Sequence, residues 1–235
     1  MKRISVAAAG AALAIGAACS DHSPSAPVDT TSILPRGFVV SNAQVNVGTA
    51  SPVASGSVAA SSSLNIATGL AYVSAVPGTF PSATTATVRN QTRSGASRLI
   101  PIIDGGIDPV GIEAAAGDEL ALTLLSPGGG AIQMTVVVPP RRPPGVVRTN
   151  PSKGRSDVAM NVQVVVVFSE PIDVSTVTAS SIALQENGNA VRGHVQLSAD
   201  GLSAEFIPDG LLQPQTRYTL VINTGIRDMD GDALG

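Results

Sequence analysis

The chain has 235 residues, of which 14 are Lys or Arg and 17 are Asp or Glu, giving a formal net charge of −3. Charged residues make up 13% and aromatic residues 3% of the chain, whereas Gly (24) and Pro (17) are frequent. Coiled coils and helical bundles need far more Glu, Lys and Leu, so this composition excludes them. A nucleic-acid-binding protein normally has a basic face, and the negative charge with few, scattered basic residues argues against that function.

The N-terminal residues have the pattern of a secretory signal peptide. Lys2 and Arg3 precede the apolar run from Ile4 to Ala18. At about 15 residues this run is shorter than the ~20 that span a bilayer as a helix. We therefore expect residues 1–18 to direct export and to be removed.

The only cysteine follows this segment directly. Gly16-Ala17-Ala18-Cys19 resembles a bacterial lipobox, although Gly16 stands where such boxes usually have Leu. The resemblance implies a diacylglycerol on Cys19, and several acyl chains would anchor the protein to a membrane permanently. Ser20 after the cysteine, instead of Asp, implies the outer membrane. The alternative is ordinary secretory cleavage after Ala18, which would leave Cys19 as a free thiol in an oxidising compartment.

Two stretches divide the remaining chain. Residues 19–35 are polar, contain three prolines and have no hydrophobic periodicity, so they predict a flexible tether in which His22 is solvated. Residues 139–144 (PPRRPP) favour a stiff polyproline II linker, because consecutive prolines fix φ and remove backbone donors. We expect separate domains at 36–138 and 145–235.

Residues 36–138 contain short runs rich in β-branched residues, separated by turns with Gly, which indicates an antiparallel β-sandwich. The motifs T-V-x-N (87–90), D-G-G (104–106) and A-x-x-G-D-x-L (114–120) resemble a prealbumin-like or Ig-like module of bacterial surface proteins. Residues 48–69, rich in Ala, Ser and Gly, are expected to form a loose loop. The runs expected as strands are Gly37–Val47, Leu70–Ala75, Thr84–Arg89, Arg98–Ile103, Glu119–Leu125 and Ile132–Val138.

Residues 145–235 are expected to form a second all-β domain. The run VQVVVVF at 162–168 has the length and β-branched content of a buried strand. Asn187-Gly188 and Asp200-Gly201 each predict a two-residue hairpin turn. The other expected strands are Val147–Asn150, Ser181–Gln185, Ala190–Leu197, Leu202–Ile207 and Tyr218–Asn223.

Several motifs of this second domain occur in a fixed order: N-P (150–151), F-S-E-P-I-D (168–173), A-D-G (199–201), L-x-P-x-T-x-Y (212–218) and D-x-x-G-x-x-L (228–234). This order is similar to the S-layer-type (SbsA-like) bacterial Ig-like domain, which implies a β-sandwich over 145–235. Pro214 and Tyr218 look like a tyrosine corner, in which the phenol hydroxyl bonds to the backbone. We therefore expect structural roles for both residues, as for Asn187 and Gly188.

The end of the sequence departs from that family. Its members usually continue past the D-x-x-G segment into one more strand, which is missing here. We expect either that the sequence is truncated or that another chain completes the sheet by β-augmentation.

The strongest metal-like pattern is Asp228-x-Asp230-Gly231-Asp232. Its three carboxylates are hard oxygen ligands of the kind that Ca²⁺ takes, although the EF-hand spacing is absent. The alternative is a polar turn that binds no metal, and we expect no other cofactor. Asp104, Asp108 and Glu113 are expected to be turn and rim residues.

Candidate catalytic residues are few. A Ser-His-Asp triad needs a histidine between nucleophile and carboxylate. His194 lies in an expected strand without a nucleophile elbow nearby, so we expect a sheet-surface residue. Glu170 and Asp173 are a formal carboxylate pair for a glycosidase, but Glu170 belongs to the F-S-E-P strand exit, where we expect a structural role.

These observations predict an all-β protein that is not an enzyme. We expect an envelope lipoprotein, held at the membrane by its N-terminal lipid, with two Ig-like or prealbumin-like sandwiches. The sandwiches would act as spacers or as adhesion surfaces for protein or polysaccharide partners. Two alternatives remain open: an accessory N-terminal part of a longer secreted enzyme or carbohydrate-active protein, and a Ca²⁺-stabilised adhesin.

Overall fold

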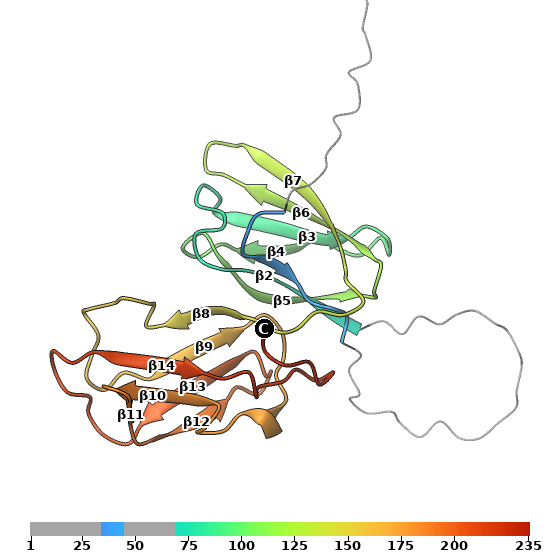
Figure 1. The fold of residues 1–235 in the computed structure, drawn as a ribbon. Coiled ribbons are helices and arrows are strands. Elements are labelled where there is room, and N and C mark those ends of the chain that lie inside the picture. Colours follow the sequence, from blue (N-terminus) through green and yellow to red (C-terminus); the bar gives the residue numbers. More distant parts are fainter. Residues whose placement is uncertain (1–33, 45–68) are drawn as a thin grey trace, which may run out of the picture. The chain divides into compact units, whose positions relative to one another are not determined.

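The computed structural model describes residues 34–44 and 69–235 (Figure 1). These residues belong to one compact unit, Ser32–Gly235. The predicted signal peptide (1–18), the lipid site at Cys19, most of the tether with His22, and nearly all of the predicted loop at 48–69 lie outside the described residues. The described part is all-β, as predicted, apart from one short 3₁₀ turn. No helix in this part is long and apolar enough to cross a bilayer.

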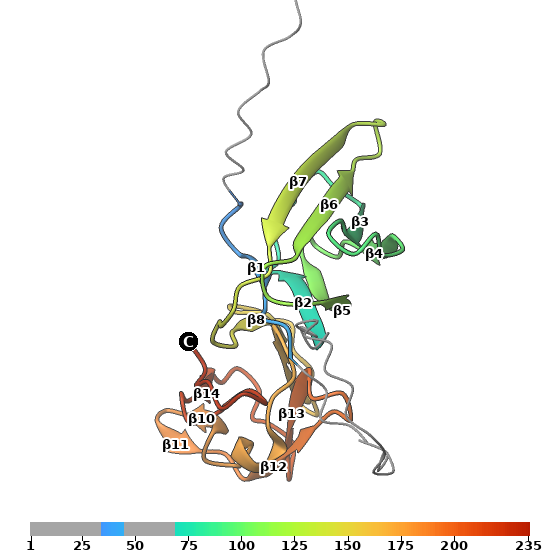
Figure 2. The same cartoon turned by 90° about the vertical axis from the view of Figure 1, so that its right-hand side faces the viewer.

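The first group of strands forms two facing sheets around one apolar core, and we call it the first sandwich. One sheet has the strand order β1-β2-β5 and the other β4-β3-β6-β7 (Figures 1 and 2). The strands are β1 (Phe38–Val40), β2 (Gly69–Ala75), β3 (Thr85–Asn90), β4 (Arg98–Pro101), β5 (Ile107–Ala114), β6 (Glu119–Leu125) and β7 (Ala131–Val137).

Alternation of buried and exposed side chains builds this core. In β3 and β6 every second residue is buried, because successive side chains of a strand point to opposite faces. The register places Val88 opposite Leu122, and both are fully buried. Val40 and Val73 from the other sheet belong to the same cluster, so two half-apolar sheets close one core.

Strand β5 was not predicted, because its sequence IDPVGIEA contains Pro109 and Gly111, which usually interrupt strands. The topology explains why both are tolerated. β5 pairs only with β2 and lies at the sheet edge, and the register shifts between Val73 and Ala75, opposite Pro109. A proline without an N–H fits such an edge or bulge. β1 ends at Val40, earlier than predicted, and up to Gln44 one isolated bridge, between Gln44 and Leu70, follows it; residues 45–47 of the predicted run lie outside the described residues.

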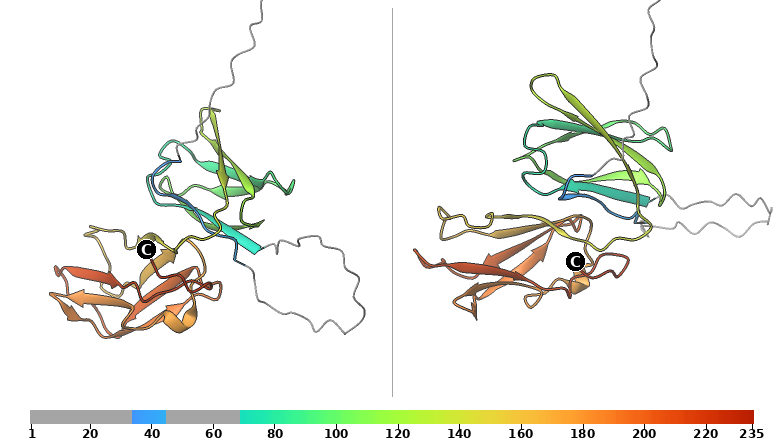
Figure 3. Two further views of the ribbon diagram at one scale, coloured as in Figure 1. Left: turned by 45° about the vertical axis from the view of Figure 1, so that its right-hand side comes forward. Right: turned by 45° about the horizontal axis from the view of Figure 1, so that its top comes forward.

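Residues 146–235 form the second sandwich, with sheets β12-β13-β9-β8 and β11-β10-β14 (Figure 3). The run Val164–Phe168 is mostly buried, and Phe168 is packed in one core cluster with Phe206 and Ile182. The elements are β8 (Val146–Asn150), β9 (Val164–Phe168), η1 (Val174–Thr176), β10 (Ile182–Glu186), β11 (Asn189–Ala190), β12 (Gly193–Leu197), β13 (Ser203–Pro208) and β14 (Tyr218–Ile222).

The two predicted hairpin turns differ. Asn187 and Gly188 both have positive φ (50° and 83°) and connect the paired residues Glu186 and Asn189, the geometry of a type I′ turn. The prediction of a two-residue turn at Asp200-Gly201 is wrong. There a four-residue turn closes from Gly201 N–H to the Ser198 carbonyl, and only Gly201 has positive φ.

The chain after β14 folds back onto the second sandwich. Ile226 and Leu234 are buried in its core, and Leu234 N–H donates to the Ile226 carbonyl at 2.9 Å. An isolated bridge joins Asp228 to Ile172, just after β9. This places the Asp228–Asp232 turn beside the exit of β9, which the sequence separates by more than 50 residues.

Candidate functional site

The predicted Asp cluster forms a compact turn. Asp228 Oδ1 accepts hydrogen bonds from the backbone N–H of Asp230 (2.9 Å) and of Asp232 (2.7 Å). Gly231 has a φ of 85° and allows the chain to reverse. One oxygen of Asp228 therefore organises the backbone that carries the other two carboxylates.

The carboxylate of Asp232 is paired with an arginine and is therefore not free to act as a metal ligand. Arg141 in the proline-rich linker donates from Nε to Oδ1 (2.8 Å) and Oδ2 (2.7 Å) of Asp232, and its Nη2 also contacts Oδ1. These hydrogen bonds, together with the Arg141 charge, hold the pKa of Asp232 below its ordinary value. Such a bidentate pair is a structural link between linker and C-terminal turn.

Glu170 joins the cluster from the exit of β9. Its side chain is fully buried, at 0% exposure. Oε2 accepts a hydrogen bond from Gln44 Nε2 at 2.8 Å, whereas Oε1 has no partner within the described part of the chain. Burial first, and then the charges of Asp228 and Asp230, raise the pKa of Glu170 to about 8. The group is therefore largely protonated at neutral pH.

Asp228 repeats this pattern. It is 1% exposed, and its second oxygen, Oδ2, is buried without a partner among the described residues. Burial is the main cause that raises its pKa, with the charges of Asp232 and Asp230 adding to it. Two neighbouring carboxyl groups thus share an apolar environment, and each keeps one unused oxygen.

Two amides of the first sandwich complete the surroundings. Asn42 Nδ2 donates to Asp230 Oδ2 at 2.6 Å, and Asn42 Oδ1 accepts from the Arg142 backbone N–H at 3.2 Å. Asn42 and Gln44 are both buried and follow β1. We call Glu170, Asp228, Asp230, Asn42 and Gln44 the acidic junction. The sequence placed Asp228 and Asp230 in one site and paired Glu170 only with Asp173, whereas it gave no signal for Asn42 and Gln44, whose contacts are long-range.

Of the other carboxylates that the sequence singled out in the first sandwich, Asp108 has a side-chain partner. Asp108 receives a bidentate pair from Arg148, Nε to Oδ1 at 2.6 Å and Nη2 to Oδ2 at 2.8 Å. Asp104 has a φ of 52° in the turn before β5, and the Glu113 carbonyl accepts from Asn90. Across residues 34–44 and 69–235, no three Asp, Glu, His or Cys side chains form a group that could hold a metal ion, and this includes the predicted set Asp228, Asp230 and Asp232.

The candidate catalytic residues are not brought together. His194 lies on the edge strand β12, and its Nδ1 is 3.8 Å from Asp209 Oδ1, with both side chains more than half exposed. Asp173 Oδ1 accepts from the Ser175 N–H and caps the 3₁₀ turn η1. An exposed pair and a helix cap do not make a buried catalytic dyad or an acid-base pair.

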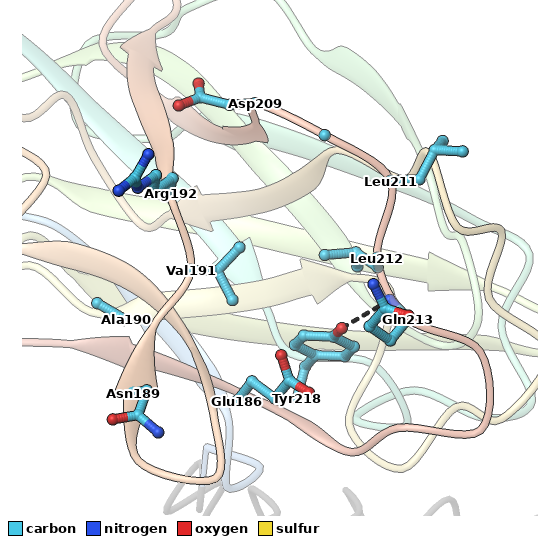
Figure 4. Close-up of a pocket in the computed structure, with 11 residues that line it drawn as sticks. Glu186, Asn189, Ala190, Val191, Arg192, Asp209, Leu211, Leu212, Gln213 and Tyr218 are labelled. Carbon is cyan, nitrogen blue, oxygen red and sulfur yellow. Dashed lines mark hydrogen bonds between the residues drawn. The ribbon is translucent and has the colours of Figure 1, made fainter.

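A surface depression of about 390 Å³ lies beside the β11-β10-β14 sheet (Figure 4). The phenol oxygen of Tyr218 accepts a hydrogen bond from the Gln213 backbone N–H at 2.8 Å, the contact of a tyrosine corner. Pro214 follows in the same loop, and its carbonyl accepts from Thr216 Oγ1 at 3.1 Å. The depression also contains Glu186 and Asp209, at separate places on its rim.

A second buried carboxylate, Asp118, lies in the first sandwich. Asp118 Oδ2 accepts from Asn90 Nδ2 (2.8 Å), from the Ala115 N–H (2.9 Å) and from Arg93 Nε. Burial acts to raise the pKa of Asp118, but these hydrogen bonds outweigh it and keep the pKa below its ordinary value. Asn90 of the T-V-x-N motif and Asp118 of the G-D motif are thus joined by a hydrogen bond.

Comparison with known proteins finds a family match in the second sandwich. Residues 140–235 are similar to the family described as the bacterial Ig-like domain. The crystal structure of the N-terminal part of the bacterial S-layer protein SbsC is similar over 39% of this chain and 21% of that chain, at 22% identity and a TM-score of 0.31. This chain therefore spans about a fifth of the S-layer structure. No curated protein sequence matches the chain.

Proposed function

We propose that this protein is a non-enzymatic envelope lipoprotein whose two sandwiches act as a spacer and as an interaction surface outside the membrane. Cys19 carries the lipid, and residues 19–35 separate the first sandwich from the bilayer. The lipobox-like segment and the bacterial Ig-like domain support this proposal. Partners are proteins or polysaccharides of the envelope, because flat sheet faces offer contact area instead of a deep pocket.

The observation that carries the proposal is the hydrogen-bonded linker. Gly145 N–H donates to Ser169 Oγ at 2.9 Å, Gly235 N–H donates to the Pro144 carbonyl at 3.0 Å, and Arg141 pairs with Asp232. The Arg148–Asp108 pair also joins β8 to β5. A spacer needs a junction that resists bending, and these contacts restrain the linker at several points.

The test uses the full chain expressed with its own leader in a Gram-negative bacterium. Detergent phase partitioning of the wild type and of Cys19→Ser measures lipid anchoring. We expect the wild type in the detergent phase and Cys19→Ser in the aqueous phase, with both sandwiches equally resistant to protease. Ser20→Ala is the matched control and should partition like the wild type. An uncut leader, or equal partitioning of the wild type and Cys19→Ser, would contradict the proposal.

A further inference from the structure

We propose that the edge strand β7 of the first sandwich pairs with β7 of a second copy of this chain, so that two 4-stranded sheets join into one. The pairing is antiparallel and centred on Met134. It names one protein partner of the interaction surface, but it depends neither on the lipid anchor nor on the spacer role. β7 forms the upper edge of its sheet in Figure 1, and it pairs with β6 alone among the described strands.

The sequence of β7 is the first argument, because it lacks the features that keep edge strands apart. Natural edge strands are usually short, or they carry a charge, a proline or a bulge. In the first sandwich β1 has 3 residues, β4 contains Arg98 and Pro101, and β5 contains Pro109 and has an interrupted register with β2. The 7 residues of β7, AIQMTVV, include no charge and no proline, and their register with β6 is continuous. The described part of the first sandwich therefore has one unprotected edge.

The direction of the backbone groups of β7 is the second argument. At the two ends of the strand, the Gly130 carbonyl accepts from the Ser126 N–H (2.9 Å), and the Val138 N–H donates to the Asp118 carbonyl (2.8 Å). Because hydrogen-bonded residues alternate along an antiparallel pair, the even-numbered residues of β7 bond to β6. The backbone N–H and C=O groups of the odd-numbered residues therefore point away from β6, and these residues are Ala131, Gln133, Thr135 and Val137.

An antiparallel copy of the same strand matches these outward-pointing groups in register. When the two strands cross at Met134, Gln133 lies opposite Thr135 of the second copy, and Ala131 lies opposite Val137. Each of these pairs exchanges two backbone hydrogen bonds. The core-facing side chains of both copies stay on one side of the joined sheet, because they alternate with the same period. The two copies are related by a two-fold axis, and since the opposite edge, β4, is protected, assembly stops at the dimer.

The side chains of β7 are the third argument. Ile132 and Val137 are 60% and 54% exposed, although their strand contributes Val136 to the core. In the joined sheet Ile132 lies beside Val136 of the second copy, and the two Met134 side chains lie beside each other. The pairing also brings no like charges together, because Glu119, the one charged residue of β6, lies opposite Val137 and the two copies of Glu119 are at opposite ends of the dimer contact.

The oligomeric state of the full chain carrying Cys19→Ser tests the proposal without the lipid anchor. This parent variant has no thiol, since Cys19 is the only cysteine. We expect analytical ultracentrifugation, from micromolar to submillimolar concentration, to show twice the mass of one chain. Thr135→Pro removes one intermolecular donor per chain and should weaken dimerisation by at least about tenfold. Thr135→Val keeps the N–H and the branched shape, so as the matched control it should dimerise like the parent.

Cysteine cross-linking tests the register and keeps the test valid if Thr135→Pro does not fold. Met134→Cys places two thiols in a non-hydrogen-bonded pair with Cα atoms ~4.5 Å apart, a separation that a disulfide spans. In the matched control, Ile132→Cys, the thiols lie on the same face but about 13 Å apart along the strands. We expect a covalent dimer from Met134→Cys and none from Ile132→Cys under mild oxidation. A monomeric parent, an unchanged dimer in folded Thr135→Pro, or cross-linking of Met134→Cys no stronger than that of Ile132→Cys would overturn the proposal.

Discussion

Each sandwich buries a carboxyl group, Asp118 in the first and Glu170 in the second, but the two have opposite pKa shifts. Asp118 in the first sandwich accepts three hydrogen bonds, one of them from Arg93, and its pKa lies below the ordinary value. Glu170 in the second accepts one, from a neutral amide, and its pKa is raised to about 8. The same chemical group is thus held ionised in one place and neutral in the other.

This difference shows that the hydrogen-bond donors around a buried carboxyl group determine whether it is held ionised or neutral. The partners of Asp118 all belong to its own sandwich, so the cluster is complete once that sandwich folds. The acidic junction draws its amides from the segment after β1 and its carboxylates from two other segments, and still leaves oxygens unused. A completed cluster stabilises a fold, whereas buried oxygens without donors lower its stability.

The largest expected effect is a pH dependence of opposite sign at the two sites. The folded-state pKa of Glu170 is raised above the ordinary value of 4.5, so between about pH 5 and 8 the folded protein holds a proton that the unfolded chain has lost. Stability at this site therefore falls as pH rises, by about 2–4 kcal/mol. Asp228, Asp230 and Arg142 are the charged groups that act on it.

Comparison with Glu170→Gln isolates this contribution, because Gln imitates the neutral acid. We expect the stability difference between Glu170→Gln and the wild type, measured by urea unfolding, to grow in favour of the variant from pH 5 to pH 8. Parallel curves would show that Glu170 is ionised in the folded state.

Asp118 should behave in the reverse manner. Because its folded-state pKa is below the ordinary value of 3.8, its contribution is complete above that pH and is lost as pH falls through the folded value. We expect Asp118→Ala to lose about 2–3 kcal/mol at pH 7, since Asn90, Arg93 and the Ala115 N–H lose their acceptor. Urea unfolding at pH 7 and pH 3 measures both effects. Asp157→Ala, which breaks an exposed pair with Arg155, should leave the stability nearly unchanged.

A smaller effect is expected at the linker. Arg141→Ala would leave the carboxylate of Asp232, which is 7% exposed, without its bidentate partner. We expect a lower stability in urea unfolding and earlier cleavage near Pro143 in limited proteolysis. Arg142→Ala, whose described contact is made by the backbone N–H, is the matched control and should be cleaved like the wild type.

The smallest expected effect is at the tyrosine corner. Tyr218→Phe removes the acceptor of the Gln213 N–H but keeps the ring. Because the Gln213 N–H is exposed to water, we expect a loss of about 0.5–1 kcal/mol in thermal or urea unfolding. A loss above about 3 kcal/mol would mean that the phenol oxygen has a further role.

Local sequence signals predicted most of the strands. Val164–Phe168 is a strand because β-branched residues fit a pleated, buried surface, and Asn187-Gly188 turns because both residues accept positive φ. β5 was not predicted, because Pro109 is tolerated only in an edge strand. Whether a strand lies at an edge is a property of the assembled sheet and cannot be read from the local sequence.

The acidic junction was predictable only in part. Asp228 and Asp230 are close in sequence and form a visible pattern, but Gln44 and Glu170 are 126 residues apart and no local signal connects them. Asp232 belonged to the same pattern, yet its partner Arg141 is 91 residues away. Local spacing shows which carboxylates cluster, while the tertiary fold decides which of them are neutralised.

We propose that the two sandwiches act as spacers, and each is closed by its own core. Single-molecule stretching of the full chain between its ends tests this most directly. We expect two separate unfolding events, one of about 300 Å for residues 145–235 and one of about 350 Å for residues 34–138. A featureless extension, or a single event that releases both lengths together, would contradict the account.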